Sequence, residues 1–505
     1  MKHRVGLVYL PGALPCFEEF GNLPTDLVDE NGLVDGKPAS QVLDMIIIPG
    51  GSLVESQTIK NGIANEISEM ADADKFVLGI CSGFQILSRG TDIGRLSPTP
   101  IFRKGMGLLD VEFKPMICTD QVKVKVVGSS LLTNEIGAEI NGFHCHTYGD
   151  INLYERAKPI LLSHVKRLDY FRNQKDIVSG ACNLKGNVVG LLTHALLDQN
   201  PLIIRGITKS LNINDDELEK INKANAKLKR LMKQEMGISK GIHPLTKTAS
   251  KEKRPRTLLI TALESGGGKT VIATGLAGAL KKRGWNVGMI KIGGDIRDIV
   301  PALYLTNEPM KDYSSIEVAD TGWQSVSKAV NGAEKDYDFV LIEGAMNAFT
   351  GLLFDKPRRP NSTAEVAAAL GSPTVIVAGC DKEGIEGGIV SALNYVRFLK
   401  KLGIKTSGVI LNKVYLNYMS DETRIIVKQA FEKAGTEMLG IVPVSDLEGR
   451  GSIPEVEIKY EEFTTKAMDL IEKNLNVDKV VEVSAPFAMK ELDYEAFVAK
   501  FKDAL

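Results

Sequence analysis

The sequence is poor in the features that mark secreted, membrane-bound or nucleic-acid-binding proteins. Its 505 residues include only 6 cysteines, which are too few for a disulfide framework. The 62 basic and 63 acidic residues leave a formal net charge of −1, which favours neither nucleic acid nor a membrane surface as a partner. No apolar run approaches the length of a membrane span, and the apolar stretch Val5–Leu10 is too short for a signal peptide. We therefore expect a cytoplasmic protein with reduced thiols.

The bulk composition predicts an ordinary globular protein with more than one domain. Hydrophobic residues make up 44% of the chain and charged residues 25%. A chain of 505 residues is too long for one hydrophobic core. In residues 4–208 and again in residues 257–475, short apolar runs alternate with helical patterns, which is typical of α/β folds. We expect two doubly wound, mostly parallel sheets, whose clearest buried strands are Met45–Ile48, Phe76–Ile80, Val188–Leu192, Phe339–Ile342, Thr374–Ala378 and Gly408–Leu411.

A segment of different character, residues 209–256, joins the two halves. Acidic side chains at 215–217 suit the first turn of a helix, and residues 247–256 are polar and basic, as in a flexible linker. The helix that would begin at these acidic residues either packs on its own domain or forms the seam of a homodimer. We favour packing on its own domain. We divide the chain into domains 1–208 and 257–505 with this connector between them. Apolar residues with heptad-like spacing mark the helix: Leu218, Ile221, Leu228 and Met232.

A glycine-flanked cysteine follows one of the expected strands. The segment Gly79–Gly83 comes directly after the apolar run 75–78 and carries Cys81 at its centre. A sharp turn from strand to helix would project Cys81 above the sheet edge, and the helix N-terminus would favour its thiolate. The backbone N–H of Ser82, and a second one from Gly50 or Gly51, would face a developing oxyanion. This pattern predicts a cysteine nucleophile.

Histidines are also few, and one of the 6 stands where a general base is needed. His194 directly follows the strand-like run 188–192, at the strand end where α/β proteins form their sites. A thiol nucleophile requires such a base, so we pair His194 with Cys81. His144 and His146 would share one face of a strand, but no third metal ligand is evident beside them.

A glycine-rich turn opens the second half, directly after the apolar run 257–260. A strand, such a turn and a following helix can cradle phosphates with backbone N–H groups. Leu263 stands where the strict phosphate-loop pattern has glycine, so the general motif is imperfect. Glu343 ends the strand-like run Phe339–Ile342 and suits a Mg²⁺ ligand. We expect ATP and Mg²⁺ to bind at a loop in which Lys269 reaches the terminal phosphates and Thr270 ligates the metal, the whole loop being Ser265, Gly266, Gly267, Gly268, Lys269 and Thr270.

The first half resembles class I glutamine amidotransferases, which carry a catalytic triad. Pro49–Gly51 matches their oxyanion loop, and Gly79–Gln85 matches their nucleophile elbow, which places Gln85 in the glutamine site. Most class I members have Glu two residues after the catalytic histidine, where this chain has Leu196. The group of cobyrinic acid a,c-diamide synthase and cobyric acid synthase also carries an apolar residue there. Further segments resemble that group, which implies that His146 lines the pocket: Gly105–Asp110, Gly142–His146 and His194–Leu197.

The second half resembles the ATP-binding domain of the same group and, more loosely, dethiobiotin synthetase. Ala262–Thr270 matches their loop form A-x-x-S-G-x-G-K-T, and the resemblance implies that Asn412 contacts the nucleotide base. We take Asp295 as a third candidate Mg²⁺ ligand. Lys291 and Asp298 are candidates for orienting substrate or phosphate. The other matching segments follow in order along the chain: Val287–Asp298, Phe339–Met346, Ser362–Ala367, Gly408–Lys413 and Gly440–Pro443.

Together the two halves predict a ligase that uses glutamine and ATP. Hydrolysis of glutamine at Cys81 would release ammonia, and ATP would activate a small-molecule carboxylate as an acyl phosphate. Ammonia would then form the amide, by a route closed to water. The corrinoid group has its ATP-binding domain first, whereas this chain has it second. The segments Gly294–Asp298 and Met346–Gly351, which border the expected ATP and substrate sites, also depart from the group's pattern. The amidated molecule is therefore expected to be a corrinoid or another tetrapyrrole, and an unrelated carboxylate stays open.

Two other functions remain open from the sequence. The first is a carboxylate-phosphorylating enzyme similar to dethiobiotin synthetase, in which the cysteine half is regulatory. The second is an ATPase that binds a partner.

Overall fold

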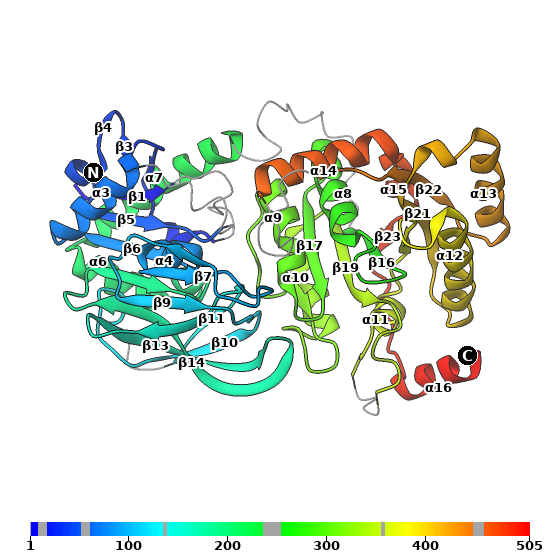
Figure 1. Ribbon diagram of the computed structural model, residues 1–505, viewed down its shortest axis with the longest axis horizontal. Coiled ribbons are helices and arrows are strands. Elements are labelled where there is room, and N and C mark those ends of the chain that lie inside the picture. The colour runs from blue at the N-terminus through cyan, green and yellow to red at the C-terminus, as the bar shows by residue number, and fades with distance from the viewer. Residues whose placement is uncertain are drawn as a thin grey trace. The chain divides into compact units, whose positions relative to one another are not determined.

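The computed structural model describes residues 2–8, 18–51, 61–134, 139–235, 254–354, 359–447 and 459–505. The chain forms two compact units (Figure 1), of which the first comprises Met1–Met236 and Gly449–Glu461 and the second Gly237–Glu448 and Glu462–Leu505. Residues 236–253 of the expected connector lie outside the described residues. The proposed domain boundaries stay a prediction. None of the helices in the described parts combines the length and the hydropathy that crossing a membrane requires.

The first unit is built on a nine-stranded sheet whose parallel strands confirm the expected fold class. If the five parallel strands are counted from 1 to 5 along the chain, their order across the sheet is 2-1-3-4-5, which is the flavodoxin-like order. Apolar residues fill them because both faces of the sheet are covered. The strands, from one edge inward, are β2 (Asp26–Val28), β1 (Val5–Val8), β5 (Met45–Ile48), β6 (Phe76–Ile80) and β15 (Val188–Leu191).

The rest of this sheet is antiparallel, which the alternation of strands and helices did not indicate. A long hairpin is joined by Asp169 and Tyr170, whose φ values of 50° and 69° are those that tight hairpin turns require. A separate four-stranded sheet has the order β12-β9-β7-β8. The antiparallel strands, continuing from β15, are β14 (Phe171–Asn183), β13 (Ala157–Leu168), β10 (Gln121–Val126) and β11 (Glu139–Phe143); the second sheet holds β12 (Asp150–Leu153), β9 (Val111–Lys114), β7 (Gly90–Asp92) and β8 (Phe102–Lys104).

The second unit contains the parallel sheet that the sequence predicts. Its strand order is β18-β17-β19-β16-β20-β21-β22, and the short strand β23 (Ala485–Pro486) adds antiparallel to β16. The phosphate loop therefore follows a central strand. The parallel strands are β18 (Ser315–Ile316), β17 (Val287–Ile292), β19 (Phe339–Asn347), β16 (Arg256–Ala262), β20 (Thr374–Gly379), β21 (Thr406–Val414) and β22 (Met438–Pro443).

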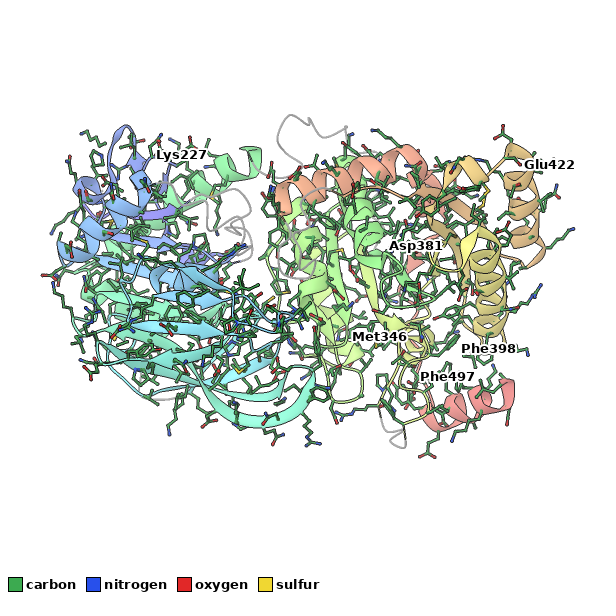
Figure 2. All side chains as sticks on the ribbon, viewed as in Figure 1. Lys227, Met346, Asp381, Phe398, Glu422 and Phe497 are labelled. Carbon is green, nitrogen blue, oxygen red and sulfur yellow. The ribbon has the colours of Figure 1, made fainter. Side chains whose placement is uncertain are left out.

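Helices of the second unit bury apolar faces against this sheet. The helix α8 (Lys269–Lys282) is buried over most of its length. The rings of Phe398 in α12 (Gly384–Lys401) and Phe501 in α16 (Tyr494–Ala504) have centroids 5.5 Å apart, and Figure 2 labels Phe398 and Phe497 in these two helices. The helix α11 (Thr363–Leu370) begins with a capping box, because Ser362 Oγ accepts from Glu365 N and donates to the Glu365 carboxylate.

The helix α7 (Asp215–Glu235) packs on the first unit through its heptad-like residues. Ile221, Leu228 and Met232 are buried. Asn225 Nδ2, on the same face, donates to Pro24 O at 2.8 Å. The apolar stripe is thus used within the chain, in line with the favoured interpretation of this helix, and a homodimer stays untested.

Candidate active sites

The first site is built around a strained turn between β6 and the helix α4 (Ser82–Leu87). Cys81 occupies this turn with φ 51° and ψ −108°, and its side chain is largely buried. A Cβ atom at Gly79 would lie 2.6 Å from the Gly83 carbonyl carbon, and one at Gly83 would overlap the Ile48 carbonyl oxygen. Only glycine fits at both positions, since helix and strand approach closely here. The local sequence thereby forces the elbow that places the thiol at the carboxyl end of the sheet.

His194 lies on the same side of the sheet, just past β15. Its backbone exchanges hydrogen bonds with Phe143, and the two rings stack with centroids 5.3 Å apart. A Cβ atom at Gly50 would lie 2.9 Å from His194 Cε1 and 3.3 Å from the Cys81 Cβ. Three strand ends therefore bring together the predicted base, the predicted nucleophile and the predicted oxyanion loop. The strand ends belong to β5, β6 and β15.

A carboxylate that the sequence did not indicate completes this group. Glu18 Oε1 lies 2.5 Å from His194 Nδ1, and Glu18 Oε2 accepts from Ala195 N at 2.8 Å. Both side chains are buried, with 2% of Glu18 and 3% of His194 exposed. Nothing in the spacing of Glu18 predicted this contact, because it joins residues 176 positions apart.

The protonation of His194 depends on these neighbours. Burial alone would lower its pKa, but the Glu18 carboxylate and the hydrogen bond with Cys81 outweigh burial and raise the pKa to about 10. The buried His144 has a pKa well below its usual value, because burial and the nearby His146 and His194 all disfavour its charge. Around Cys81, His194 is therefore the histidine that holds a proton at neutral pH, and an imidazolium next to a thiol favours the thiolate.

The other residues predicted for the glutamine site surround the elbow. Gln85 Nε2 donates to Tyr148 O at 2.9 Å, and Ser82 Oγ is buried without a hydrogen-bond partner among the described residues. His146 is buried, its Nδ1 lies 3.2 Å from Met116 O, and its ring packs edge-on against His144 at 4.8 Å. Gly51 lies at the end of the same strand-to-loop segment as Gly50. In the described parts of the chain, no three His, Cys, Asp or Glu side chains gather as a metal site would require.

The second site is formed by the loop between β16 and α8. Gly266 and Gly268 have φ values of 79° and 95°, which favour glycine, and a Cβ atom at Gly268 would overlap Asn412 Nδ2. Asn412 Nδ2 donates to Gly267 O at 2.8 Å, so the residue expected near the base also fixes the loop. Lys269 begins α8 and donates through Nζ to Met346 O at 2.7 Å.

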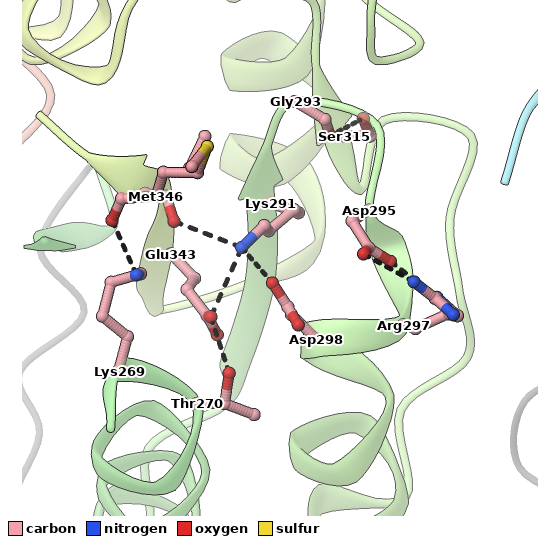
Figure 3. Close-up of polar contacts among 12 residues, drawn as sticks. Lys269, Thr270, Lys291, Gly293, Asp295, Arg297, Asp298, Ser315, Glu343 and Met346 are labelled. Atoms are coloured by element: carbon pink, nitrogen blue, oxygen red, sulfur yellow. Dashed lines mark hydrogen bonds and ion pairs between the residues drawn. The ribbon is translucent and has the colours of Figure 1, made fainter. Parts of the chain in front are cut away.

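Behind the loop, the charged residues predicted for this half form one buried cluster (Figure 3). Thr270 Oγ1 donates to Glu343 Oε1 at 2.9 Å. Lys291 Nζ lies 2.5 Å from Asp298 Oδ2, 3.4 Å from Glu343 Oε1 and 3.2 Å from Gly344 O. Lys291 and Glu343 are 3% and 1% exposed, whereas Asp298 is 40% exposed. The adjacent strands β17 and β19 and the short 3-10 helix Ile296–Ile299 thus supply one cation between two carboxylates.

The buried charges in this cluster depend on one another. Burial raises the pKa of Glu343, and Lys291 opposes that rise. Burial alone would lower the pKa of Lys291, but Asp298 and Glu343 raise it above its usual value. Glu343 Oε2 is buried and finds no hydrogen-bond partner among the described residues. A buried carboxylate oxygen without a donor, beside the Thr270 hydroxyl, is the oxygen set that a Mg²⁺ ion prefers, so these residues fit the expected metal.

Asp295 has a different partner from the other acids. Both of its carboxylate oxygens accept from the Arg297 guanidinium at 2.8 Å (Figure 3). Burial by itself would raise the pKa of Asp295, but Arg297 holds it below its usual value. A metal ion bound by Asp295 would therefore share this carboxylate with the Arg297 guanidinium.

Unusual backbone angles mark both sites. Four residues other than glycine that have positive φ stand at or next to predicted site residues, and their φ values are 51°, 58°, 34° and 58°. Positive φ costs energy for residues with a Cβ atom, and such strain clusters at functional positions. In the same order, the four residues are Cys81, Ala195, Met346 and Lys413.

Comparison with known protein families matches each half separately. Residues 8–202 match the CobB/CobQ-like glutamine amidotransferase domain. Residues 258–450 match the CobQ/CobB/MinD/ParA nucleotide binding domain. The amidotransferase match comes first along the chain.

Similar curated proteins carry related names. The chain is 30% identical over 237 residues to cobyrinate a,c-diamide synthase of Streptococcus sanguinis, covering 45% of this chain and 49% of that protein. It is 28% identical over 214 residues to cobyric acid synthase of Clostridium botulinum, covering 39% and 40%. It is 31% identical over 192 residues to hydrogenobyrinate a,c-diamide synthase of Mycobacterium bovis, covering 38% and 40%. The chain thus spans half or less of the length of each of these relatives.

Proposed function

We propose that this chain, which carries a CobB/CobQ-like glutamine amidotransferase domain and a CobQ/CobB/MinD/ParA-type nucleotide-binding domain, is an ATP-dependent ligase that makes an amide from a carboxylate and glutamine. The observation that carries the proposal is the presence of both sites in one chain. One holds Cys81 and His194 at strand ends, and the other holds a phosphate loop next to Thr270 and Glu343. Neither site alone accounts for amide synthesis with glutamine as the nitrogen donor.

In the glutamine reaction, the Cys81 thiolate attacks the side-chain amide carbon of glutamine. His194 gives its proton to the nitrogen, the C–N bond breaks, and ammonia leaves. Water then attacks the thioester while His194 accepts a proton, which releases glutamate and restores the thiolate. The backbone N–H of Ser82 and one from Gly50 or Gly51 stabilise the oxyanion in both steps.

In the ATP reaction, the loop from Ser265 to Gly268 binds the phosphates through backbone N–H groups, and Lys269 exchanges its bond to Met346 O for a phosphate oxygen. The γ-phosphoryl group moves to the substrate carboxylate, which gives an acyl phosphate and ADP. Ammonia attacks the acyl carbon and phosphate leaves. Thr270 and Glu343 would hold Mg²⁺, with Asp295 as the third candidate ligand. That ion would supply positive charge to the phosphate oxygens.

We infer that Lys291 and Asp298 orient the acyl-phosphate end of the substrate, since Asp298 is the exposed member of the buried cluster. The relatives named for cobyrinate, hydrogenobyrinate and cobyric acid favour a corrinoid or another tetrapyrrole carboxylate as the substrate. The reaction draws on glutamine and ATP, which fits a cytoplasmic enzyme.

The proposal is tested by measuring glutamate release, ADP release and amide formation with cobyrinate as the probe substrate. Wild type should form the amide with glutamine or with ammonium as nitrogen donor. Cys81→Ala should lose the glutamine reaction but keep the ammonium reaction, and Lys269→Ala should lose both amide-forming reactions. ADP release is also measured with neither glutamine nor ammonium present. If Cys81→Ala then releases ADP as fast as wild type does, the result would favour a carboxylate-phosphorylating enzyme and contradict the proposal.

A further inference from the structure

A carboxylate from a distant part of the chain holds the imidazole of His194. Glu18 reaches His194 Nδ1 with one oxygen at 2.5 Å and the backbone N–H of Ala195 with the other at 2.8 Å. Both carboxylate oxygens are therefore used, and each accepts from the same turn. A carboxylate with this geometry fixes the ring so that Nε2 faces the thiol, and it stabilises the imidazolium that forms during proton transfer.

The residues that follow His194 in the sequence offer no other acid that could hold its imidazole. Leu196, two residues after the histidine, is fully buried and has no ionisable group. Asp198, the next acid along the chain, is engaged elsewhere. Its Oδ2 accepts from Glu19 N at 2.8 Å and its Oδ1 from Gly21 N at 2.7 Å.

The contacts of Asp198 explain how Glu18 is kept in place. Asp198 binds the backbone directly after Glu18, while Glu18 binds the backbone directly after His194, so the two segments are joined by reciprocal carboxylate-to-backbone bonds. Gly21 has φ 62°, and a Cβ atom there would overlap the Ile204 side chain. This tight turn brings the Glu19 and Gly21 N–H groups to one carboxylate.

The helix α7 supports the same segment from the other side. Lys229 Nζ lies 2.9 Å from the Glu19 carboxylate and 2.5 Å from Asn22 Oδ1. Asn225 donates to Pro24 O. The connector helix therefore anchors the residues that follow Glu18, which gives it a role near the amidotransferase site.

We propose that Glu18 is the positioning acid of the Cys81–His194 pair, so that the triad of this chain takes its carboxylate from a segment 176 positions before the histidine. This inference rests on the proposed glutamine hydrolysis. Glu18 does not touch the reacting thiol; it acts through His194. The titratable groups that face His194 are Cys81 from the elbow, Glu18, and His144 from the segment after β11, and Asp198 faces Glu18.

The test compares Glu18→Gln with Glu18→Asp and with Glu139→Gln. Glutamine at 18 keeps the shape and an acceptor for Ala195 N, but it removes the charge and disfavours the N–H on Nδ1 of His194. Glutamine-dependent glutamate release should fall by about a hundredfold or more in kcat, with KM for glutamine little changed. Glu18→Asp should recover part of the rate. Glu139→Gln changes an exposed acid of β11 that pairs with Lys123 and takes no part in holding Glu18, so it should behave as wild type.

A second measurement separates positioning from folding. The rate of Cys81 alkylation by iodoacetamide reports the reactivity of the thiol, and at pH 7 it should be lower in Glu18→Gln than in wild type, because the neighbouring imidazole is no longer held by a carboxylate. Ammonium-dependent amide formation should be unchanged, because it does not use this site. An unchanged alkylation rate with wild-type glutamate release would overturn the role of Glu18. Wild type that releases no glutamate while Cys81 is alkylated would instead contradict the proposed function.

Discussion

Removing the buried cation behind the phosphate loop gives a quantitative test of how the metal site works. Lys291→Met shortens the side chain by one heavy atom and leaves Glu343 and Asp298 without their shared partner. At an effective dielectric constant of about 20, opposite charges 3.4 Å apart attract by about 5 kcal/mol. This attraction keeps Glu343 ionised against the cost of its burial. Without Lys291, less opposes the rise that burial causes in the pKa of Glu343, so we expect its carboxylate to be protonated more readily and to become a poorer Mg²⁺ ligand.

The assay is binding of a fluorescent ATP analogue across Mg²⁺ concentrations at pH 6.5 and pH 9. The variant should need about tenfold or more Mg²⁺ at the lower pH, and the difference from wild type should shrink at the higher pH as Glu343 loses its proton. Lys281→Met is the matched control, because its ion pair with Glu308 at 2.8 Å lies outside the site. We expect less than a twofold change for it, since partly exposed ion pairs contribute little.

Two outcomes would refute this reasoning. If Lys291→Met needs less Mg²⁺ than wild type at every pH, then the main effect of Lys291 is to repel the ion, and Lys291 does not act by keeping Glu343 ionised. If the Mg²⁺ requirement does not change with pH, the protonation of Glu343 is not involved. Adding Glu343→Gln to Lys291→Met should have a smaller further effect at pH 6.5 than at pH 9, because more of the carboxylate is protonated at the lower pH.

Three further predictions concern the elbow, the loop and the buried ion pair. Gly83→Ala should lower the free energy of unfolding by about 1–3 kcal/mol, measured by thermal unfolding, because the new Cβ overlaps the Ile48 carbonyl. It should also reduce glutamate release, and wild-type activity would contradict the elbow geometry. Asn412→Leu should raise Kd for ATP about tenfold without changing glutamate release, because Gly267 O loses its donor; an unchanged Kd would contradict the bracing role. The pKa of His194 rises from 6.5 to about 10 on folding, so its proton stabilises the fold fully below pH 6.5 and this contribution is lost as pH rises through 10. The difference in Tm between wild type and Glu18→Gln should therefore be larger at pH 6.5 than at pH 10, and a difference that grows with pH would contradict the ion pair.

The features that the sequence predicted well are those set by local pattern. Glycines flanking Cys81 and glycines before Lys269 act within a few residues, so their spacing already indicates a strand, a sharp turn and a helix. Buried parallel strands are likewise marked by short apolar runs such as Met45–Ile48 and Phe339–Ile342. These patterns led to the correct fold class and to residues that the structure brings together at strand ends.

The features that the sequence did not predict depend on contacts between distant segments. Glu18 has no local pattern that links it to His194, and only the turn held by Asp198 brings it there. The antiparallel strands of the first unit were not anticipated, because their half-exposed residues lack the continuous apolar runs of buried strands. Asp295 was expected beside the metal, and the nearby Arg297 that occupies both of its oxygens was not considered.

The central claim is that Cys81 is the nucleophile of a glutamine site, and covalent labelling tests it without knowledge of the amidated substrate. The intact chain is treated with 6-diazo-5-oxo-L-norleucine, an electrophilic glutamine analogue, and the adduct is located by peptide mass spectrometry. The account predicts one adduct at Cys81, prevented by excess L-glutamine and absent from Cys81→Ala. A folded protein that forms no adduct, or one whose adducts fall on other cysteines regardless of glutamine, would contradict it.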